Sequence, residues 1–156
     1  MKKVFALLAV SALLLTGCGE KEVSASSDNL PTVTTNQGEA PTIGAPAGNP
    51  PTTLEIKDII VGNGAEALPT STMTVHYTLM TWSNGQLIES SWNGGSPATF
   101  PLANVIVGWQ QGIPGMKEGG RRLLVIPAEL GYGAAGGGPI GPNETLIFVV
   151  DVISVS

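Results

Sequence analysis

The stretch TMTVHYTLMTWSNGQLIE, residues 72–89, decides the fold. Apolar and polar side chains alternate through its first half, which predicts a β-strand with one buried face. The residues of that face are Met73, Val75, Tyr77 and Leu79. The Asn-Gly dipeptide at positions 84–85 is typical of a tight hairpin turn, so residues 86–89 would return as the antiparallel neighbour.

Strand-like segments continue on both sides of this hairpin. Residues 54–61 begin with the same alternation, residues 146–155 are a nearly continuous apolar run, and residues 121–126 are a further strand-like segment. A single short helix is predicted around residues 105–111, because Gly112 and Pro114 end it quickly. These elements predict an α+β fold, in which a curved antiparallel sheet of about five strands wraps around one short α-helix.

The first 17 residues have the pattern of a bacterial secretory signal. Lys2 and Lys3 precede a twelve-residue apolar run, which is shorter than the roughly 20 residues needed to span a membrane. The run ends in LTGC, residues 15–18, which resembles the lipobox of bacterial lipoproteins. This resemblance implies cleavage before Cys18 and lipidation of its thiol. The alternative is an ordinary secretory signal with a chance cysteine.

Two further regions follow the signal peptide. More than half of residues 19–53 are Gly, Pro, Ser, Thr or Asn, and none is aromatic. Such a composition buries too little apolar surface to offset the entropy of ordering, so residues 18–53 are predicted to be a lipidated cysteine with a disordered linker. Residues 54–156 are long enough for one domain with a single core.

Composition excludes several kinds of site. Cys18 is the only cysteine, so no disulfide or cysteine-based zinc site can form within the chain. The only histidine, His76, is interpreted as a structural strand residue, and the acidic residues form no cluster with metal-ligand spacing. We therefore expect no metal and no cofactor. The formal net charge of −5 argues against nucleic-acid binding.

The sequence GYGAAG, residues 131–136, matches the glycine pattern of a dinucleotide-binding turn. That motif requires a long helix that begins inside it, because the helix N-terminus holds the pyrophosphate. Here GGPIGP follows directly, and so many glycines and prolines cannot sustain a helix. The pattern therefore predicts a turn and no nucleotide site.

Aromatic side chains lie on several elements that could converge. They are Tyr77, Phe100, Trp109, Tyr132 and Phe148. Core packing is the simpler interpretation of any one of them. Trp109, however, lies between glycines 108 and 112, and Tyr132 lies in the glycine-rich loop, where a ligand-facing phenol is more common than a core residue. The set indicates an aromatic pocket.

Seven blocks of residues 54–156 resemble, in order, the signatures of the FKBP family of peptidyl-prolyl isomerases. The blocks are VHYT (75–78), ESS (89–91), PATFPL (97–102), VIVGW (105–109), MKEGGRR (116–122), IPAELGYG (126–133) and PNETLIF (142–148). The resemblance covers essentially the whole predicted domain.

The resemblance implies roles for residues of the pocket. Trp109 would form the floor on which the substrate proline lies, and the Tyr132 hydroxyl and the Ile106 N–H would donate hydrogen bonds to substrate carbonyls. Glu89, where the family usually has Asp, would partner the Tyr77 phenol. The implied substrate-binding residues are Phe100, Val105, Ile106, Ile140 and Phe148.

The sequence departs from the family pattern at Ile88, Ala98, Glu89 and Gly137. Ile88 and Ala98 replace larger aromatic residues, and Glu89 is one methylene longer than Asp. Catalytic rate and affinity for macrolide inhibitors would be affected more than the fold.

The resemblance implies a lipid-anchored bacterial isomerase that acts on proline-containing unfolded or folding proteins outside the cytoplasm. In a Gram-negative cell we expect it on the periplasm-facing outer membrane, as a monomer. One alternative is a holdase that captures proline-containing peptides without turnover. Another is a surface lipoprotein that uses the scaffold for adhesion or assembly.

Overall fold

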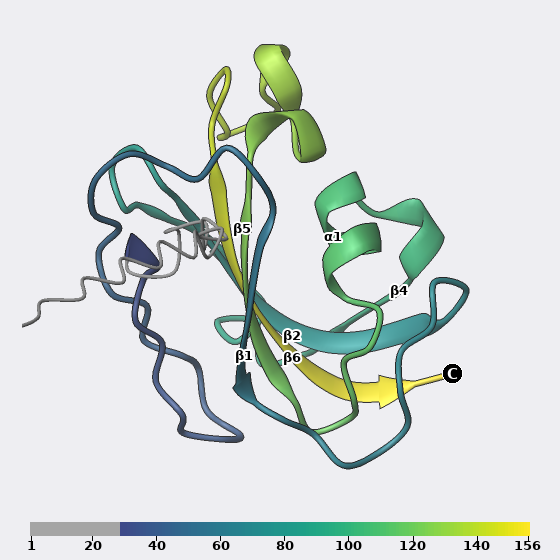
Figure 1. The fold of residues 1–156 in the computed structure, drawn as a ribbon. Coiled ribbons are helices and arrows are strands. Elements are labelled where there is room, and N and C mark those ends of the chain that lie inside the picture. The colour runs from purple at the N-terminus through teal and green to yellow at the C-terminus, as the bar shows by residue number, and fades with distance from the viewer. Residues whose placement is uncertain (1–28) are drawn as a thin grey trace, which may run out of the picture.

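The structure, a computed structural model, describes residues 29–156. Within them, an antiparallel sheet curves around one short helix, which lies against a single face of the sheet (Figure 1). The strands are β1 Glu55–Ile60, β2 Thr72–Thr81, β3 Leu87–Ser90, β4 Ala98–Pro101, β5 Arg121–Ile126 and β6 Leu146–Val155. The helix is α1, Val107–Gly112, and short 3₁₀ turns occupy Leu102–Asn104, Ala128–Leu130 and Gly133–Ala135. The predicted α+β class is confirmed.

The predicted hairpin forms from β2 and β3. The two strands are antiparallel, with Thr78 opposite Ser90 and Leu79 opposite Glu89. Gly85 in the turn has a φ of 63°, a left-handed conformation that glycine adopts at no steric cost. The turn therefore sets where Glu89 lies relative to the residues of β2.

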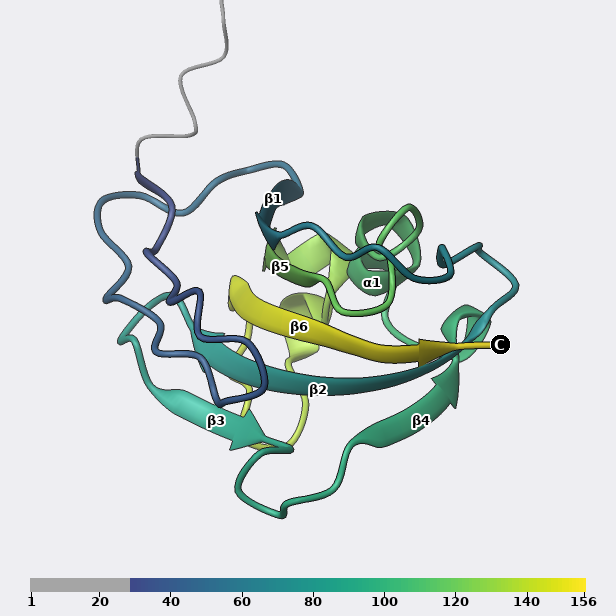
Figure 2. The same cartoon turned by 90° about the horizontal axis from the view of Figure 1, so that it is seen from below.

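A sixth strand, β4, was not predicted. The strand order is β1-β5-β6-β2-β3, and β4 also pairs with β2. β3 pairs with the second half of β2 and β4 with its first half, so the two short strands follow one another along one edge (Figure 2). The sequence of β4 is only four residues long and ends in Pro101, which an edge strand tolerates but which weakens the strand signal.

The main core lies between the sheet and α1. Met73, Val75 and Leu79 are each at most 4% exposed on this side, and Tyr77 is partly buried beside them. The predicted inner face of β2 is therefore confirmed. The helix begins at Val107, two residues later than predicted, because the backbone of Ile106 is still extended with φ −58° and ψ 151°.

Two glycines bring α1 close to β5. A Cβ on Gly108 would overlap the side chain of Ile126, and a Cβ on Gly112 would lie 2.7 Å from Leu124 Cδ2. Ile126 and Leu124 are fully buried. The neighbours that come this close to the helix are therefore buried side chains of β5.

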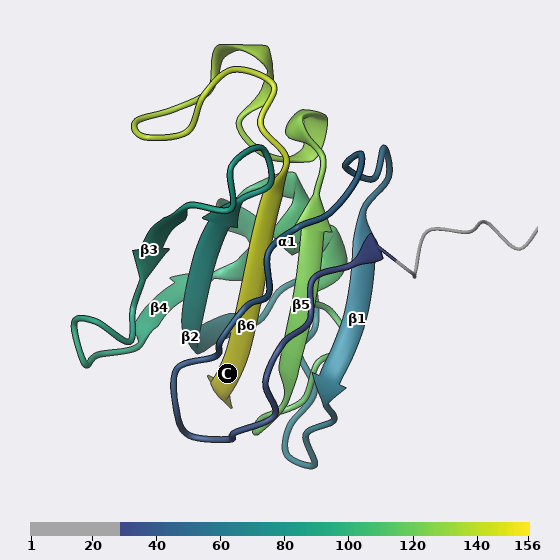
Figure 3. The ribbon, with the colours of Figure 1, turned by 90° about the vertical axis from the view of Figure 1, so that its left-hand side faces the viewer.

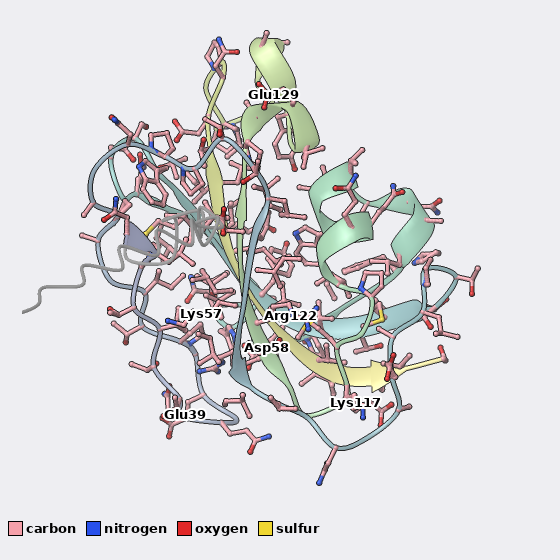
Figure 4. The ribbon with its side chains drawn as sticks, viewed as in Figure 1. Glu39, Lys57, Asp58, Lys117, Arg122 and Glu129 are labelled. Atoms are coloured by element: carbon pink, nitrogen blue, oxygen red, sulfur yellow. The ribbon has the colours of Figure 1, made fainter. Side chains whose placement is uncertain are left out.

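An ion pair beside the helix joins three elements. Arg122 of β5 points toward Asp58 of β1 (Figure 4), and its Nε donates to Asp58 Oδ1 at 2.6 Å. Arg122 Nη1 also donates to the carbonyl of Gly112 at 2.8 Å. Arg122 thus satisfies a carbonyl at the C-terminal end of α1 and connects it to β1 and β5.

Residues 29–53, which we call the N-terminal strap, differ from the prediction. They were expected to belong to a disordered linker, but they lie across the outer face of the sheet, over β5 and β6 (Figure 3). Val33 and Ile43 form an antiparallel bridge, and with Leu30 they pack against a second core cluster. The buried members of that cluster are Trp82, Leu123, Val125, Ile147 and Val149.

Arg121 fastens the strap to the sheet. Its side chain is fully buried, and its Nε donates to Asp151 Oδ1 at 2.7 Å. Its terminal nitrogens donate to the carbonyls of Thr34 at 2.9 Å and Glu39 at 2.6 Å. Burial raises the pKa of Asp151, and the positive charge of Arg121 opposes that shift. A few apolar contacts and one buried guanidinium therefore order a segment whose composition predicts disorder.

The predicted signal peptide, residues 1–17, and Cys18 lie outside the described residues, as does the linker up to residue 28. Within residues 29–156, no helix has the length and apolar character needed to cross a membrane.

Candidate active site

A cavity of about 320 Å³ opens on the helix side of the sheet. Strands β2, β3, β4 and β6, helix α1 and two connecting loops all contribute to its wall. The lining residues are Tyr77, Leu79, Glu89, Ala98, Phe100, Asn104, Val105, Ile106, Trp109, Tyr132 and Phe148. Eight of the nine residues assigned to the pocket from sequence therefore meet around one cavity.

Trp109 lies at the centre of the aromatic wall. Its ring centroid is 5.7 Å from that of Tyr77, 5.3 Å from that of Phe100 and 5.2 Å from that of Phe148. All three contacts are edge-to-face, a favoured arrangement for aromatic pairs. Trp109 is only 5% exposed, so its ring is held by packing. The result is a preformed apolar surface that can accept a small aliphatic ring.

Tyr77 and Glu89 form a polar pair at the wall of the cavity. The Tyr77 hydroxyl donates to Glu89 Oε1 at 2.6 Å. Burial raises the pKa of Tyr77 well above its usual value, and the carboxylate of Glu89 raises it further. The phenol therefore stays protonated at physiological pH. Because Glu89 pairs with Leu79, two positions beyond Tyr77, the extra methylene of Glu still lets the carboxylate reach this diagonal neighbour.

Val105 and Ile106 form the loop that leads into α1. The Ile106 carbonyl accepts hydrogen bonds from the N–H groups of Trp109 at 3.0 Å and Gln110 at 3.2 Å. The N–H of Ile106 has no acceptor among residues 29–156. A backbone donor is thus left available at the wall of the cavity.

Tyr132 extends over the cavity from the loop between β5 and β6. It is 42% exposed and lines the cavity as expected. Gly133 and Gly136 have φ values of 66° and 69°, so the glycine pattern is needed for the turns around the tyrosine. A Cβ on Gly137 would lie 3.0 Å from Tyr132 Cδ1, so the missing side chain at 137 leaves room for the ring. The glycine pattern opens no long helix, as predicted.

One sequence-based assignment differs from the site, and two residues that line the cavity were missed. Ile140, expected to bind substrate, does not line the cavity; it is 5% exposed and packs in the main core after a tight turn closed on Gly137. Leu79 and Asn104 do line the cavity and were missed. Both could have been predicted from the sequence. Leu79 lies on the same face of β2 as Tyr77, and Asn104 directly precedes Val105.

His76 lies outside the cavity lining. Its ring stacks on Trp92 with centroids 3.9 Å apart, and its Nδ1 lies 2.9 Å from Ser91 Oγ. These contacts give His76 a packing role next to the β2–β3 edge, apart from the aromatic site.

A family model described as FKBP-type peptidyl-prolyl cis-trans isomerase matches residues 64–153, which include every residue that lines the cavity. The chain belongs to the FKBP family of peptidyl-prolyl cis-trans isomerases.

Known proteins resemble this FKBP chain over long stretches. It is 50% identical over 121 residues to the FK506-binding protein of Streptomyces anulatus, covering 75% of this chain and 98% of the relative. It is 43% identical over 106 residues to the outer membrane protein MIP of Legionella longbeachae, covering 67% of this chain and 45% of that protein. The crystal structure of AtFKBP13 matches with a TM-score of 0.62 at 37% identity, over 69% of this chain and 96% of that one.

These findings confirm the predicted FKBP fold and the isomerase activity. The alternative of a non-catalytic holdase is not favoured, because relatives of this FKBP are described as isomerases. The similarity to the Streptomyces protein covers 75% of the chain, more than residues 54–156 alone, so it extends into the strap.

Proposed function

We propose that this FKBP isomerises X-Pro bonds by noncovalent catalysis in the aromatic cavity. In this proposal the proline ring lies on Trp109 between Phe100 and Phe148. The Tyr132 hydroxyl and the Ile106 N–H donate to substrate carbonyls, and the Tyr77–Glu89 pair shapes the polar wall. The observation that carries the proposal is the set of edge-to-face aromatic contacts around Trp109, next to the Ile106 N–H, which has no acceptor among residues 29–156.

The energetics suit such a site. Rotation about the peptide bond meets a barrier of about 18–20 kcal/mol, because conjugation is lost in the twisted state. Uncatalysed isomerisation takes tens of seconds, and a rate gain of about 10⁴ requires about 5.5 kcal/mol. The planar amide is more dipolar than the twisted one, so an apolar cavity disfavours the ground state, and fixed donors can stabilise the twisted state. No proton transfer is needed.

We also propose that the enzyme acts outside the cytoplasm, anchored through a lipid on Cys18. The signal-like residues 1–17 and the LTGC motif support this, as does the similarity to a relative described as an outer membrane protein. Its substrates would be proline-containing exported proteins during folding. Since relatives are described as FK506-binding proteins, macrolide inhibitors are expected to compete for the same cavity.

Proline-isomerisation kinetics on residues 29–156 would test the catalytic proposal. We expect Trp109→Ala to abolish most of the rate gain by removing the floor of the cavity. Tyr132→Phe should reduce kcat/KM by about 5- to 10-fold, the value of one hydrogen bond. Tyr132→Phe is a more specific probe than Trp109→Ala, because phenylalanine keeps the aromatic ring and removes only the hydroxyl. A wild type that binds proline peptides without exceeding the uncatalysed rate would refute the proposal.

Fractionation of cells that express the full chain would test the anchor. Wild-type protein should incorporate labelled palmitate and sediment with membranes. Cys18→Ser should do neither, because the acylated thiol would be absent. Membrane association that persists unchanged in the serine variant would exclude Cys18 as the anchor.

A further inference from the structure

The side chain of Gln110 makes two directed contacts next to the cavity. Gln110 follows Trp109 in α1, and its Nε2 donates to the carbonyl of Val105 at 2.7 Å and to that of Ala103 at 3.3 Å. Both acceptors are backbone carbonyls, so the amide must present its nitrogen to them. Gln110 does not line the cavity.

The Val105 carbonyl and the Ile106 N–H belong to the same peptide group. A peptide group is planar and trans, so its C=O and N–H point in opposite directions. Holding the carbonyl on the side of Gln110 therefore fixes the N–H on the other side. This is the N–H that has no acceptor among the described residues, and both Val105 and Ile106 line the cavity. A hydrogen bond to the carbonyl also polarises the N–H of the same group.

The side chains of Val105 and Ile106 pack against the main core, but within residues 29–156 Gln110 makes the only hydrogen bond to this peptide group. Val105 has φ −99° and ψ 175°, and Ile106 is extended, so residues 105–106 form a short extended link between a 3₁₀ turn and α1. The helix that carries Gln110, in contrast, is held firmly. Gly108 and Gly112 let it pack closely against β5, and Arg122 binds the carbonyl of Gly112.

We infer that Gln110 is a positioning residue that orients the peptide group of Val105 and Ile106, so that the Ile106 N–H faces the bound substrate. The inference rests on the proposed role of that N–H in binding a substrate carbonyl. It concerns a residue that does not line the cavity and would act through the backbone carbonyls that it binds. An amide donor is required at this position, because a carboxylate would place its oxygens against two carbonyl oxygens.

Gln110→Met tests the inference, since methionine keeps the length and helix preference of glutamine without its donor. The matched control is Gln111→Met, an exposed neighbour on the same helix. We expect kcat/KM to fall about 5- to 10-fold in Gln110→Met and to stay near wild type in Gln111→Met. In NMR spectra, the hydrogen-exchange rate and the chemical shift of the Ile106 amide should differ from wild type in Gln110→Met and not in Gln111→Met.

Gln110→Glu provides a second readout that a general packing effect would not give. At neutral pH the carboxylate cannot donate, so activity should fall; below pH about 4 protonated Glu has a donor again, and activity relative to wild type should recover. Gln111→Glu should show no such recovery. Equal activity of wild type and both Gln110 variants would overturn the inference. An inactive wild type would instead refute the proposed function, so the two failures are distinguishable.

Discussion

At the scale of single residues, the contact between Tyr77 and Glu89 shows what a change of one methylene does. Asp at position 89 is the usual family residue implied by the resemblance, and Glu is one methylene longer. In the structure the hydrogen bond is still made, at 2.6 Å. A side chain with an additional torsion can reach a diagonal neighbour from more than one position, so the substitution is absorbed locally.

The ionisation of Tyr77 gives a direct test of this contact. Tyr77 and Tyr132 are the only tyrosines, so Tyr132→Phe leaves Tyr77 as the sole phenol. Burial and the Glu89 carboxylate both raise its pKa, and we expect absorbance at 295 nm to show no ionisation in the folded protein at pH about 10.5, where an ordinary tyrosine is mostly ionised. Glu89→Gln in the same background should move the midpoint down.

The raised pKa of Tyr77 makes the stability of the folded protein depend on pH. Above pH about 10 the unfolded chain releases the Tyr77 proton while the folded protein keeps it, so the contribution of this group to stability is lost as pH rises. Below that pH it is fully present. Ionisation with a midpoint near 10 in the folded Tyr132→Phe protein would contradict the contact.

At the scale of elements, α1 can pack closely against β5 because Gly108 and Gly112 have no side chains. A larger residue at position 108 or 112 would place its side chain against Ile126 or Leu124 and separate the helix from the strand. Glycine costs helix stability of about 1 kcal/mol relative to alanine in isolation. Here the close packing offsets that cost and places Trp109 against the aromatic wall.

Gly108→Ala should therefore destabilise the protein despite the better helix propensity of alanine. The new Cβ meets the branched side chain of Ile126, which is fully buried among other core residues. We expect a net loss of about 1–2 kcal/mol in urea denaturation, the usual scale of overpacking. Gly141→Ala is the matched control, since a Cβ there meets nothing within 4 Å. A stabilised Gly108→Ala protein would show that α1 can shift away from β5.

At the scale of the whole molecule, the strap enlarges the domain beyond the region that the sequence marks as folded. Leu30, Val33 and Ile43 cover an apolar face that would otherwise meet water, and Arg121 completes its hydrogen bonds with strap carbonyls. The strap and α1, whose Trp109 lines the cavity, lie on opposite faces of the sheet (Figure 1). Removing the strap should therefore affect stability more than the catalytic geometry.

A chain of residues 50–156 compared with residues 29–156 tests this expectation. We expect the shorter chain to lose about 2 kcal/mol or more of unfolding free energy, since charged hydrogen bonds are worth about 1.5–3 kcal/mol and apolar burial adds to them. Fluorescence of Trp82 should shift toward that of a solvated indole. Under conditions where it is folded, the shorter chain should keep its kcat. Equal stability of the two chains would mean that the strap contributes nothing to the fold.

The sequence by itself determined the fold class, the family and most of the cavity. Those predictions depend on local patterns: the alternation in β2, the Asn-Gly turn, and aromatic residues inside recognisable blocks. Strand alternation and turn residues act over a few neighbouring positions, so they can be recognised without the tertiary structure. The resemblance to the FKBP family implied eight of the residues that line the cavity, including Trp109 and Tyr132.

Only the tertiary structure decided that the strap is ordered, that Ile140 belongs to the core and that Gln110 holds the loop at Val105. Each depends on which distant or main-chain groups meet. Arg121 and Gln110 both bind backbone carbonyls. Every residue type has such a carbonyl, so the residue type of the partner does not predict the contact. Burial of Ile140 likewise depends on how the chain turns after Gly137, and composition alone does not specify that path.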